Sequence, residues 1–491
     1  LPVAFNDLRE WIDDLEERKD LTRVRAEVDW DEEIGAITRE VSSQFGPALL
    51  FENIKDHQHS FCHRLFTNGT GTRERVCRFL GVPETTSYRE LVLVFKDRFN
   101  KPVKPVTVRR GPVKENIFSG AQIDLFQLPV PKWNPHDGGR YICTSASIVT
   151  RDPDSGLLNV GTYRGMIAQK NTIGVLLAMT QGWGKHFSKY KNRGQEMPVA
   201  VVIGWDQTLF LAASTPVNYP EYEMAGSLRG APVELVKCET NDLMVPATAE
   251  IVLEGFISPD PNTYEPEGPF SEYPGYYAGR KTPKHAIRVE CISHRNDPIF
   301  HGCLTGASPG RTNEGTTWTP ATFSAMAWQY LEQAGVPNVM GVWRGKWPEL
   351  LRVQIRKSHR GHAQQVAAAL WGCHLGNYAG KHLIVVDDDI DIHDWEAIEW
   401  ALCYRLNAGL GDITMFPGTS GSMLDPSVPL EERDSVKYGH GKWTRVLLDA
   451  TINWELEPQE QYGGNRYPPL GTTISEKMGA TVKRRWKEYG L

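Results

Sequence analysis

The 491-residue sequence predicts a multidomain protein that mixes α+β and α/β architecture. The chain is too long for one ordinary core, so two or three domains are expected. Short β-branched runs dominate its middle, whereas strand and helix patterns alternate after Thr316. We therefore predict three parts: an N-terminal α/β region with a linker (1–117), a split β-barrel (118–315), and a linking helix with a C-terminal α/β domain (316–491).

The N-terminal part shows helical and extended patterns in turn. Apolar residues at helical spacing predict a helix over 8–15, and alternation predicts a strand over 21–30. Residues 31–41 place acids in a first turn and an apolar face behind them, which predicts a second helix. Residues 101–117 are basic and rich in proline, so we interpret them as a linker.

The middle of the chain is rich in strand signals. Runs of β-branched residues bounded by Gly, Pro or Asp predict strands over 146–152, 157–168, 198–205, 233–240, 248–257 and 285–294. Two short helices are predicted between them, over 182–194 and 221–230. Many short strands with few helices are typical of a barrel or a split barrel.

The pattern of residues 316–491 predicts an α/β layer. Helices are predicted over 319–335 and 361–372, each ending at a glycine. Residues 381–406 predict a strand that runs into a helix. Such alternation of strands and helices indicates a sheet covered by helices.

Composition limits the classes of function. With 54 basic and 60 acidic residues the net charge is -6, which disfavours nucleic-acid binding. No apolar run approaches the roughly 20 residues that span a bilayer, and residues 1–11 lack the layout of a signal peptide. The eight cysteines are scattered without a CxxC pair, which indicates reduced thiols and disfavours a thiolate zinc site. We expect a cytoplasmic protein without a membrane span.

The segment YEPEGPFSEYPGYY (264–277) carries the most informative chemistry. It places Glu265, Glu267 and Glu272 in a stretch whose prolines make it stiff. A stiff loop can hold acids where general acid–base chemistry needs them. The flanking aromatic residues could wall the acids into a pocket of low dielectric. A polar surface turn is the alternative interpretation.

A second group of polar residues lies upstream. Asn159 and Arg164 fall in one predicted strand, five residues apart, so both reach one site only if Gly161 introduces a bulge or twist. Asn159 alone could be a turn amide. A buried Arg164 needs an anionic partner, and Glu267 and Glu272 are candidates.

Glu221 and Glu223 begin a predicted helix. Acids at that position can simply stabilise the helix dipole. They could instead complete a hard-cation site with Asn159 and His186, because oxygen ligands suit Mn²⁺ or Mg²⁺. A histidine such as His186 is equally compatible with a structural role.

Several segments together resemble the UbiD family of prenylated-flavin-dependent decarboxylases. They are DGGRY (137–141), NVGTYRGM (159–166), TNDLMVPATAEIVLEG (240–255), PEGPFSEYPGYY (266–277) and VVDDDIDIHDWEAIEWAL (385–402). The resemblance covers nearly the whole chain. It implies a flavin-reductase-like split barrel that binds the cofactor, and a C-terminal domain used to form a homodimer or a larger homo-oligomer.

The resemblance also implies the cofactors. These would be prenylated FMN supplied by a separate flavin prenyltransferase, Mn²⁺ (or Mg²⁺) bridging its phosphate to the protein, and K⁺ nearby. By motif match the metal ligands would include Asn159 and Glu221, while Lys381 would contact the cofactor. The residues expected around the cofactor are Asn159, Thr162, Tyr163, Arg164, Gln181, Gly182, Glu221 and Lys381. The family's metal-binding histidine falls where Gly182 stands, so His186 is the candidate substitute.

The catalytic residues implied by the resemblance are Arg164, Glu267 and Glu272, with Glu272 as proton donor. The expected reaction is the non-oxidative, reversible decarboxylation of an aromatic, heteroaromatic or α,β-unsaturated acid. It would run through a covalent adduct with prenylated FMN, which acts as electron sink. Arg164 would keep Glu267 ionised.

The sequence predicts the substrate less specifically than the reaction. By resemblance residues 301–318 cover the pocket, where His301 and Arg311 could bind a second polar group of the substrate, although Arg311 could also form an ordinary salt bridge. Two other functions fit the residues. A glycoside hydrolase could use Glu267 and Glu272 as acid and base, and a non-catalytic assembly subunit could retain the fold.

Overall fold

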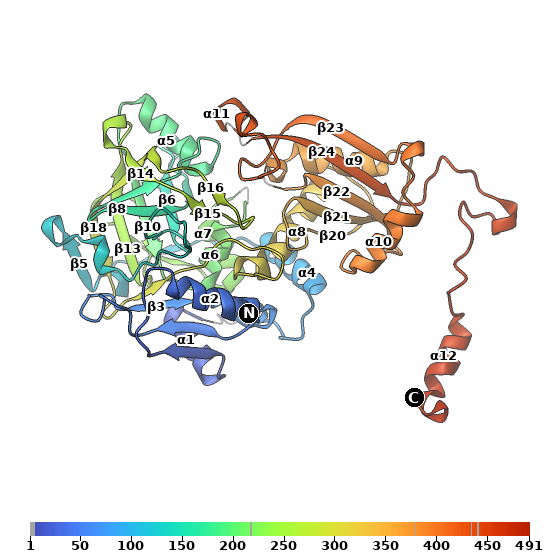
Figure 1. Ribbon diagram of the computed structural model, residues 1–491, viewed down its shortest axis with the longest axis horizontal. Helices are drawn as coiled ribbons and strands as arrows, with labels where there is room; N and C mark the ends of the chain where they lie inside the picture. The colour runs from blue at the N-terminus through green and yellow to red at the C-terminus, as the bar shows by residue number, and fades with distance from the viewer. Residues whose placement is uncertain (1–4, 217–218, 378, 434, 439–440) are drawn as a thin grey trace.

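The computed structural model describes residues 5–216, 219–377, 379–433, 435–438 and 441–491. Two lobes are visible in Figure 1: a larger lobe built from the N-terminal and central parts, and a smaller lobe formed by the C-terminal domain. Helix α8 (Gly315–Gln333) runs from the larger lobe to the smaller one and packs on both α4 and β20. A mixed multidomain fold of helices and sheets is therefore confirmed.

The N-terminal part folds around a small sheet of order β1-β2-β3-β19. Its elements are α1 Leu8–Glu17, β1 Leu21–Val24, α2 Glu33–Ser43, β2 Ala48–Phe51, β3 Arg64–Thr67, α3 Arg73–Phe79 and α4 Tyr88–Phe99. The Asp7 side chain caps α1 by accepting from two backbone N–H groups. The strand predicted over 21–30 ends at Val24, and β19 (Ile299–His301) reaches this sheet from far along the chain.

The central sheet has eight strands, in the order β7-β6-β10-β13-β18-β9-β8, with β5 also paired to β18. The strands are β5 Asn116–Ser119, β6 Ser147–Arg151, β7 Leu158–Gly161, β8 Gly165–Gln169, β9 Thr172–Val175, β10 Met197–Ile203, β13 Ile251–Ile257 and β18 Ala286–His294. A separate sheet joins β12 Met244–Pro246, β11 Glu234–Lys237 and β4 Val106–Thr107.

Two predictions for this region are wrong in detail. The expected linker over 101–117 contains β4, which pairs with β11, and the start of β5, which pairs with β18. The single strand expected over 157–168 is two strands, since residues 162–164 leave the ladder between β7 and β8.

Three helices pack on the central sheets: α5 Gly182–Asn192, α6 Gln207–Ala213 and α7 Glu221–Arg229. Helix α6 has no counterpart among the predictions. Six of its seven residues are buried, so it lacks the polar face that produces a helical periodicity in sequence.

The C-terminal domain is a five-stranded sheet of order β20-β21-β22-β24-β23. Its strands are β20 Val339–Trp343, β21 Leu350–Ile355, β22 His382–Asp387, β23 Ile413–Ser420 and β24 Lys442–Ala450, and its helices are α9 His362–Gly372, α10 Trp395–Tyr404 and α11 Ser435–Tyr438. Helix α8 begins at Gly315, ahead of the predicted start at residue 319. Among the described residues, no helix combines the length and the apolar character that a membrane crossing requires.

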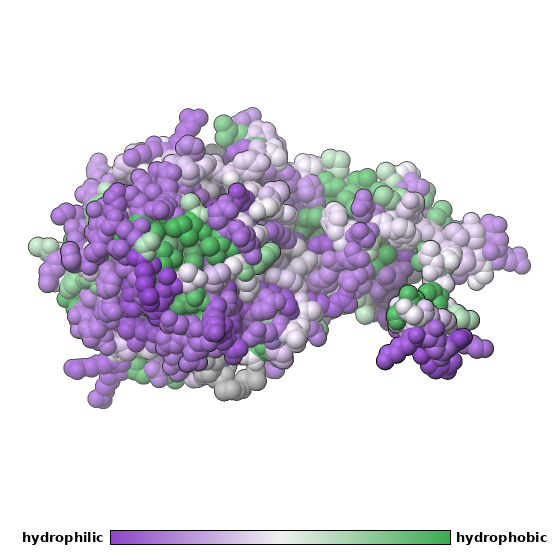
Figure 2. All heavy atoms as spheres, turned by 60° about the horizontal axis from the view of Figure 1, so that its bottom comes forward, coloured by the Kyte–Doolittle hydropathy of each residue, from purple (hydrophilic) through white to green (hydrophobic). Residues whose placement is uncertain are grey.

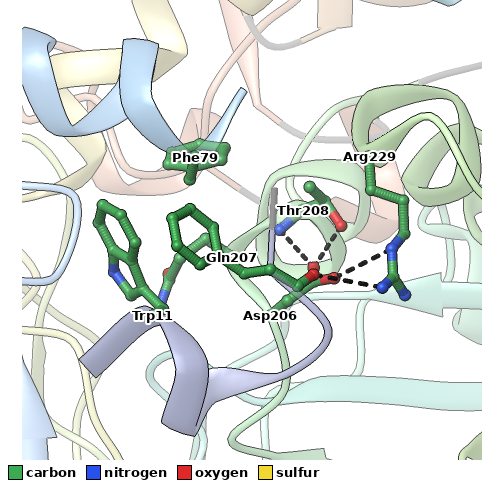
Figure 3. A pocket seen from close by; sticks show the side chains of 7 residues that line it. Trp11, Phe79, Asp206, Gln207, Thr208 and Arg229 are labelled. Atoms are coloured by element: carbon green, nitrogen blue, oxygen red, sulfur yellow. Dashed lines mark hydrogen bonds and ion pairs between the residues drawn. The ribbon is translucent and has the colours of Figure 1, made fainter. Parts of the chain in front are cut away.

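A buried ion pair ties α6 to α7 beside helix α1 (Figure 3). Asp206 caps α6 by accepting from the Thr208 backbone N–H at 2.8 Å, and its Oδ2 lies 3.4 Å from Arg229 Nε. The pair borders a cavity of only about 10 Å³, closed by Phe5, Trp11 and Phe79. Both helices continue to the larger cavity described below, so this pair fixes one wall of the site.

We expect Arg229→Met to lower the free energy of unfolding by about 3 kcal/mol at pH 7, because it leaves the Asp206 carboxylate buried without a cation. Burial raises the pKa of Asp206 above its ordinary value. The carboxyl therefore takes up a proton as the pH falls, and the deficit should shrink towards about pH 4. Denaturant unfolding at both pH values measures the difference.

The matched control is Arg360→Met, which removes an exposed cation paired with Glu455. It should change the free energy of unfolding by less than about 0.5 kcal/mol. An equal loss of stability in both variants would contradict a special role for the Asp206–Arg229 pair.

Candidate active site

A cavity of about 740 Å³ lies where the central part meets the C-terminal domain. The central part contributes Asn159, Thr162, Tyr163, Gln181, Gly182, Glu221 and Glu272, and the C-terminal domain contributes Arg344, Lys346, Trp347 and His374. Segment 303–306 and the start of α8 form a further wall. The structure thus brings six predicted cofactor-contact residues and one predicted catalytic acid to one cavity.

The Arg164 guanidinium lies between two carboxylates of the acidic segment. Its Nη1 donates to Glu272 Oε1 at 2.5 Å and its Nη2 donates to Glu267 Oε2 at 3.1 Å. Arg164 can reach them because residues 162–164 leave the strand ladder; the predicted bulge at Gly161 is not the cause. The acidic segment itself forms short ribbons, in which β14 (Glu265–Glu267) pairs with β17 (Thr282–Lys284) and β15 (Phe270–Ser271) pairs with β16 (Tyr277–Ala278).

Glu267 is fully buried, and its carboxylate accepts hydrogen bonds from three side chains. Besides Arg164, Lys284 Nζ donates to its Oε2 at 2.5 Å and Tyr141 Oη donates to its Oε1 at 2.8 Å. Burial alone would favour the neutral acid, but the charges and hydrogen bonds of Arg164 and Lys284 outweigh it and hold the pKa of Glu267 below its ordinary value. Glu267 is therefore an ionised, structurally fixed carboxylate. Sequence reasoning missed Lys284, which is the last residue of β17, the strand that pairs with β14.

Glu272 differs from Glu267 in its access to the cavity. It is the one acid of the 264–277 segment that lines the cavity among the described residues. Its Oε1 accepts from Arg164, and within the described parts of the chain its Oε2 has no hydrogen-bond partner. Glu265 instead pairs with Gln169 away from the cavity. The aromatic wall expected around the acids is partial: Phe270 and Tyr273 lie inward, whereas Tyr276 is exposed.

The DGGRY segment holds the acidic segment in place. Asp137 Oδ1 accepts from the Ser271 backbone N–H at 2.9 Å, and Gly138 N–H donates to Pro269 O at 2.8 Å. Gly138 is needed for this approach, because a Cβ there would lie 2.1 Å from the Gly268 carbonyl oxygen. The close backbone contact fixes the position of Glu272 relative to the cavity.

Two of the three predicted metal ligands, Asn159 and Glu221, line the cavity. Asn159 Nδ2 donates to Tyr163 Oη at 3.1 Å, and Glu221 Oε2 accepts from the Val160 backbone N–H at 3.0 Å. Burial raises the pKa of Glu221 to about 7. A Cβ at position 182 would lie 1.8 Å from Asn159 Oδ1, so the Asn159 amide occupies the space that a side chain at Gly182 would need.

His186, on α5, does not line the cavity. Its Nδ1 hydrogen-bonds Thr150 Oγ1 at 3.0 Å, and burial lowers the pKa of its imidazole. No group of three or more His, Cys, Asp or Glu side chains arranged for a metal ion occurs in the described residues. A metal site formed by Asn159, Glu221 and His186 therefore stays a prediction.

Other predicted residues lie elsewhere. Lys381 Nζ is bound to Asp425 Oδ2 at 2.8 Å in the C-terminal domain, outside the cavity lining. Arg311 forms a surface ion pair with Glu40, and His301 is buried in β19. Segment 301–318 does line the cavity, through other residues.

Three cations that sequence reasoning missed line the cavity instead: Lys185, Arg344 and Lys346. Burial lowers the pKa of Arg344 to about 10 and lowers that of Lys346. The sequence gives no signal for Arg344 and Lys346, because their place at the cavity depends on how the C-terminal domain packs against the central part. Lys185 lies on α5 in the central part, one turn after Gly182.

Comparison with protein families gives three consecutive matches to 3-octaprenyl-4-hydroxybenzoate carboxy-lyase: its N-terminal domain over residues 12–94, its Rift-related domain over 104–308 and its C-terminal domain over 317–450. The UbiD-class enzyme HmfF from Pelotomaculum thermopropionicum, solved with FMN, is 32% identical, with 95% of this chain and 99% of that chain covered and a TM-score of 0.77. The chain belongs to the UbiD family. It is accordingly a carboxy-lyase.

Further solved UbiD-class structures refine the comparison. The vanillic acid decarboxylase of Sedimentibacter hydroxybenzoicus in closed form is 31% identical over 98% of this chain and 99% of that chain, with a TM-score of 0.86. The open form of the same enzyme gives a TM-score of 0.80. An evolved dimeric form of HmfF, solved with prFMN, matches at 31% identity over 92% of this chain and 96% of that chain, with a TM-score of 0.76. This UbiD chain thus resembles the closed form more than the open one.

We expect Gly138→Ala to lower turnover by about 100-fold, because the added methyl pushes the acidic segment away and a shift near 1 Å in a catalytic group has this scale of effect. The control is Gly372→Ala at the end of α9, where the new Cβ meets nothing within 4 Å. CO₂ release and thermal unfolding should be measured for both variants. Full activity in Gly138→Ala would show that the contact does not set the position of Glu272.

Proposed function

We propose that this UbiD protein decarboxylates an aromatic, heteroaromatic or α,β-unsaturated carboxylic acid with prenylated FMN, and that Glu272 is the proton donor. The observation that carries the proposal is the unequal placement of two carboxylates around one guanidinium. Glu267 is buried and hydrogen-bonded by three side chains, whereas Glu272 lines the cavity with one oxygen unengaged by the described residues. Only the second arrangement allows a proton to pass to a bound ligand.

The cavity supports the cofactor assignment. Its volume of about 740 Å³ lies within the range of about 300–1,000 Å³ that is usual for ligand sites. One end offers the polar groups of Asn159, Thr162, Gln181 and Glu221, which suit a phosphate and a hard cation. When bound, the prenylated flavin would supply the electron sink for the departing carboxylate.

The protein's own groups would perform the remaining work. Arg164, held by Glu267, binds Glu272 Oε1 and directs the carboxyl group towards the cavity. Glu272 delivers a proton to the substrate carbon once CO₂ has left, and takes it from the same carbon in the carboxylation direction. Because Glu267 stays ionised, the guanidinium keeps a fixed counter-charge throughout the cycle.

The lining of the cavity favours an aromatic substrate. Phe210, Trp318, Phe323, Tyr330 and Trp347 contribute rings to it. Flat aromatic acids bury well between such side chains, while a few polar groups set their orientation. Relatives that act on vanillic acid are consistent with this class of substrate.

The glycoside hydrolase alternative is disfavoured by the geometry. That mechanism needs two carboxyl groups facing each other across an open groove. Here both acids bind the same Arg164, and Glu267 is buried with Lys284 and Tyr141. It cannot act as the second catalytic acid without breaking this network.

We expect Glu272→Gln to abolish CO₂ release while leaving cofactor content unchanged. The amide keeps the shape of the side chain but has no proton of comparable acidity to give. Parent and variant, each co-produced with a flavin prenyltransferase, should show the same flavin absorbance. Turnover of a panel of aromatic acids, with deuterium incorporation from D₂O, measures proton delivery.

Glu265→Gln is the matched control, because it alters an acid of the same segment that pairs with Gln169 outside the cavity. It should retain parental turnover. Normal CO₂ release by Glu272→Gln would refute the proton-donor assignment, and a colourless parent protein would refute the flavin assignment.

The metal assignment has its own test. Glu221→Gln should reduce the Mn²⁺ and flavin content of the purified protein, because it removes the charged oxygen ligand at the polar end of the cavity. His186→Gln should leave both unchanged if His186 serves Thr150 alone, and should reduce both if the imidazole replaces the family ligand. Elemental analysis and absorbance report metal and flavin separately. Unaltered metal content in Glu221→Gln would contradict the assignment of Glu221 as a metal ligand. The binding of K⁺ stays a prediction.

A further inference from the structure

Arg39, on helix α2, directs its guanidinium into the molecule from a solvated face. The bottom of Figure 1, where the N-terminal part lies, comes forward in Figure 2, and this face is mainly hydrophilic. Glu40, the next residue of α2, stays on the surface with 60% of its side chain exposed. The Arg39 side chain is half-buried instead, and it reaches segment 303–306, which forms one wall of the cavity.

The guanidinium of Arg39 joins two separate segments of the chain. Its Nη1 donates to the Gly306 carbonyl oxygen, and its Nη2 donates to the Thr305 carbonyl oxygen at 2.9 Å. The same Nη2 also donates to Asn134 Oδ1 at 3.1 Å. Hydrogen bonds from a charged donor are roughly twice as strong as those between neutral groups. Arg39 therefore holds segment 303–306 and Asn134 in a fixed relation to each other.

Both segments continue to Ser271, in strand β15. On one side, Asn134 donates its backbone N–H and its Nδ2 to Asp137 Oδ2, at 3.0 and 3.1 Å. Asp137 Oδ1 in turn accepts from the Ser271 backbone N–H at 2.9 Å. On the other side, Thr305 Oγ1 donates to the Ser271 carbonyl oxygen at 2.8 Å. The two backbone polar groups of Ser271 are thus held by two chains of hydrogen bonds that meet at Arg39.

Ser271 directly precedes Glu272, so its backbone decides where the cavity acid begins. Gly306 packs against this point, because a Cβ there would lie 2.8 Å from Ser271 Oγ and 3.1 Å from the Glu272 carbonyl oxygen. Ser271 and Asp137 are each only 5% exposed, so water does not compete for their hydrogen bonds. The wall that Arg39 holds is therefore in contact with the backbone of the acid itself.

We propose that Arg39 is a positioning residue through which the N-terminal part fixes Glu272 relative to the cavity. The inference rests on the proposed function, because it gives Arg39 a catalytic effect only if Glu272 delivers the proton. Among the described residues that line the cavity, Arg39 is not included, so it acts through the two chains of hydrogen bonds. Its loss should slow proton delivery, which depends steeply on geometry, more than the binding of substrate or flavin.

Kinetics of three full-length variants, each co-produced with a flavin prenyltransferase, test the catalytic effect. We expect Arg39→Met to lower kcat by about 30-fold with less than about 2-fold change in KM and with parental flavin absorbance. The solvent isotope effect of D₂O on kcat should increase, because proton delivery becomes the slow step. Arg39→Lys should stay within about 5-fold of the parental kcat, since the ammonium keeps the charge but lacks the fork. Glu40→Gln, which breaks only a surface ion pair with Arg311, should match the parent.

Hydrogen exchange of the flavin-loaded protein without substrate gives a readout that does not depend on turnover. In Arg39→Met the backbone N–H groups of segment 264–277 should exchange about 10-fold faster than in the parent, while those of α6 and α7 keep parental rates. Asn134→Ala should accelerate the same segment. Combined with Arg39→Met it should add less than the product of the two single effects, because both changes break one chain of hydrogen bonds.

Three results would overturn the positioning role. They are parental exchange of segment 264–277 in Arg39→Met, a raised KM or lost flavin at unchanged kcat, and faster exchange throughout the molecule. The second would assign Arg39 to the shape of the cavity, and the third to general stability. Failure of the proposed function gives a different result: Glu272→Gln would then turn over at the parental rate, while hydrogen exchange still reports whether Arg39 holds the segment.

Discussion

The sharing of one guanidinium by two carboxylates is the constraint on which the site depends. Arg164 and Lys284 together offset the burial of Glu267, and Tyr141 donates a further hydrogen bond to it. Three features of the surrounding structure bring these residues together. They are the break between β7 and β8, the pairing of β14 with β17, and the close approach of Gly138 to the acidic segment.

The same network separates the roles of two chemically identical side chains. Glu267 gains its low pKa from two cations and cannot exchange protons with the cavity. Glu272 touches only the edge of the guanidinium and keeps an oxygen on the cavity side. Environment, rather than residue type, therefore decides which acid can transfer a proton and which one serves as a fixed counter-charge.

Sequence reasoning succeeded where the physical signal is local. The apolar period of 8–15 predicts α1, and the short β-branched runs predict most central strands, because burial on one face leaves a pattern in the chain. It failed where burial is complete, as in α6, or where a very short exposed strand pairs at a sheet edge, as in β4. The Arg164–Glu267–Glu272 cluster was predictable from residue types, whereas Lys284 and Arg344 were not, since their positions depend on ribbon pairing and domain packing.

The acidic segment is finally coupled to the position of the C-terminal domain. Tyr273, next to Glu272, donates its hydroxyl to Glu349 Oε1 at 3.0 Å and lies 3.1 Å from Ser422 Oγ, both in that domain. Arg344, Lys346 and Trp347 reach the cavity from the same side. The greater similarity to a closed relative than to its open form agrees with this contact. Two such hydrogen bonds contribute only about 0.5–1.5 kcal/mol each, but they tie the residue next to the cavity acid to the C-terminal domain, so the position of that domain bears on the placement of Glu272.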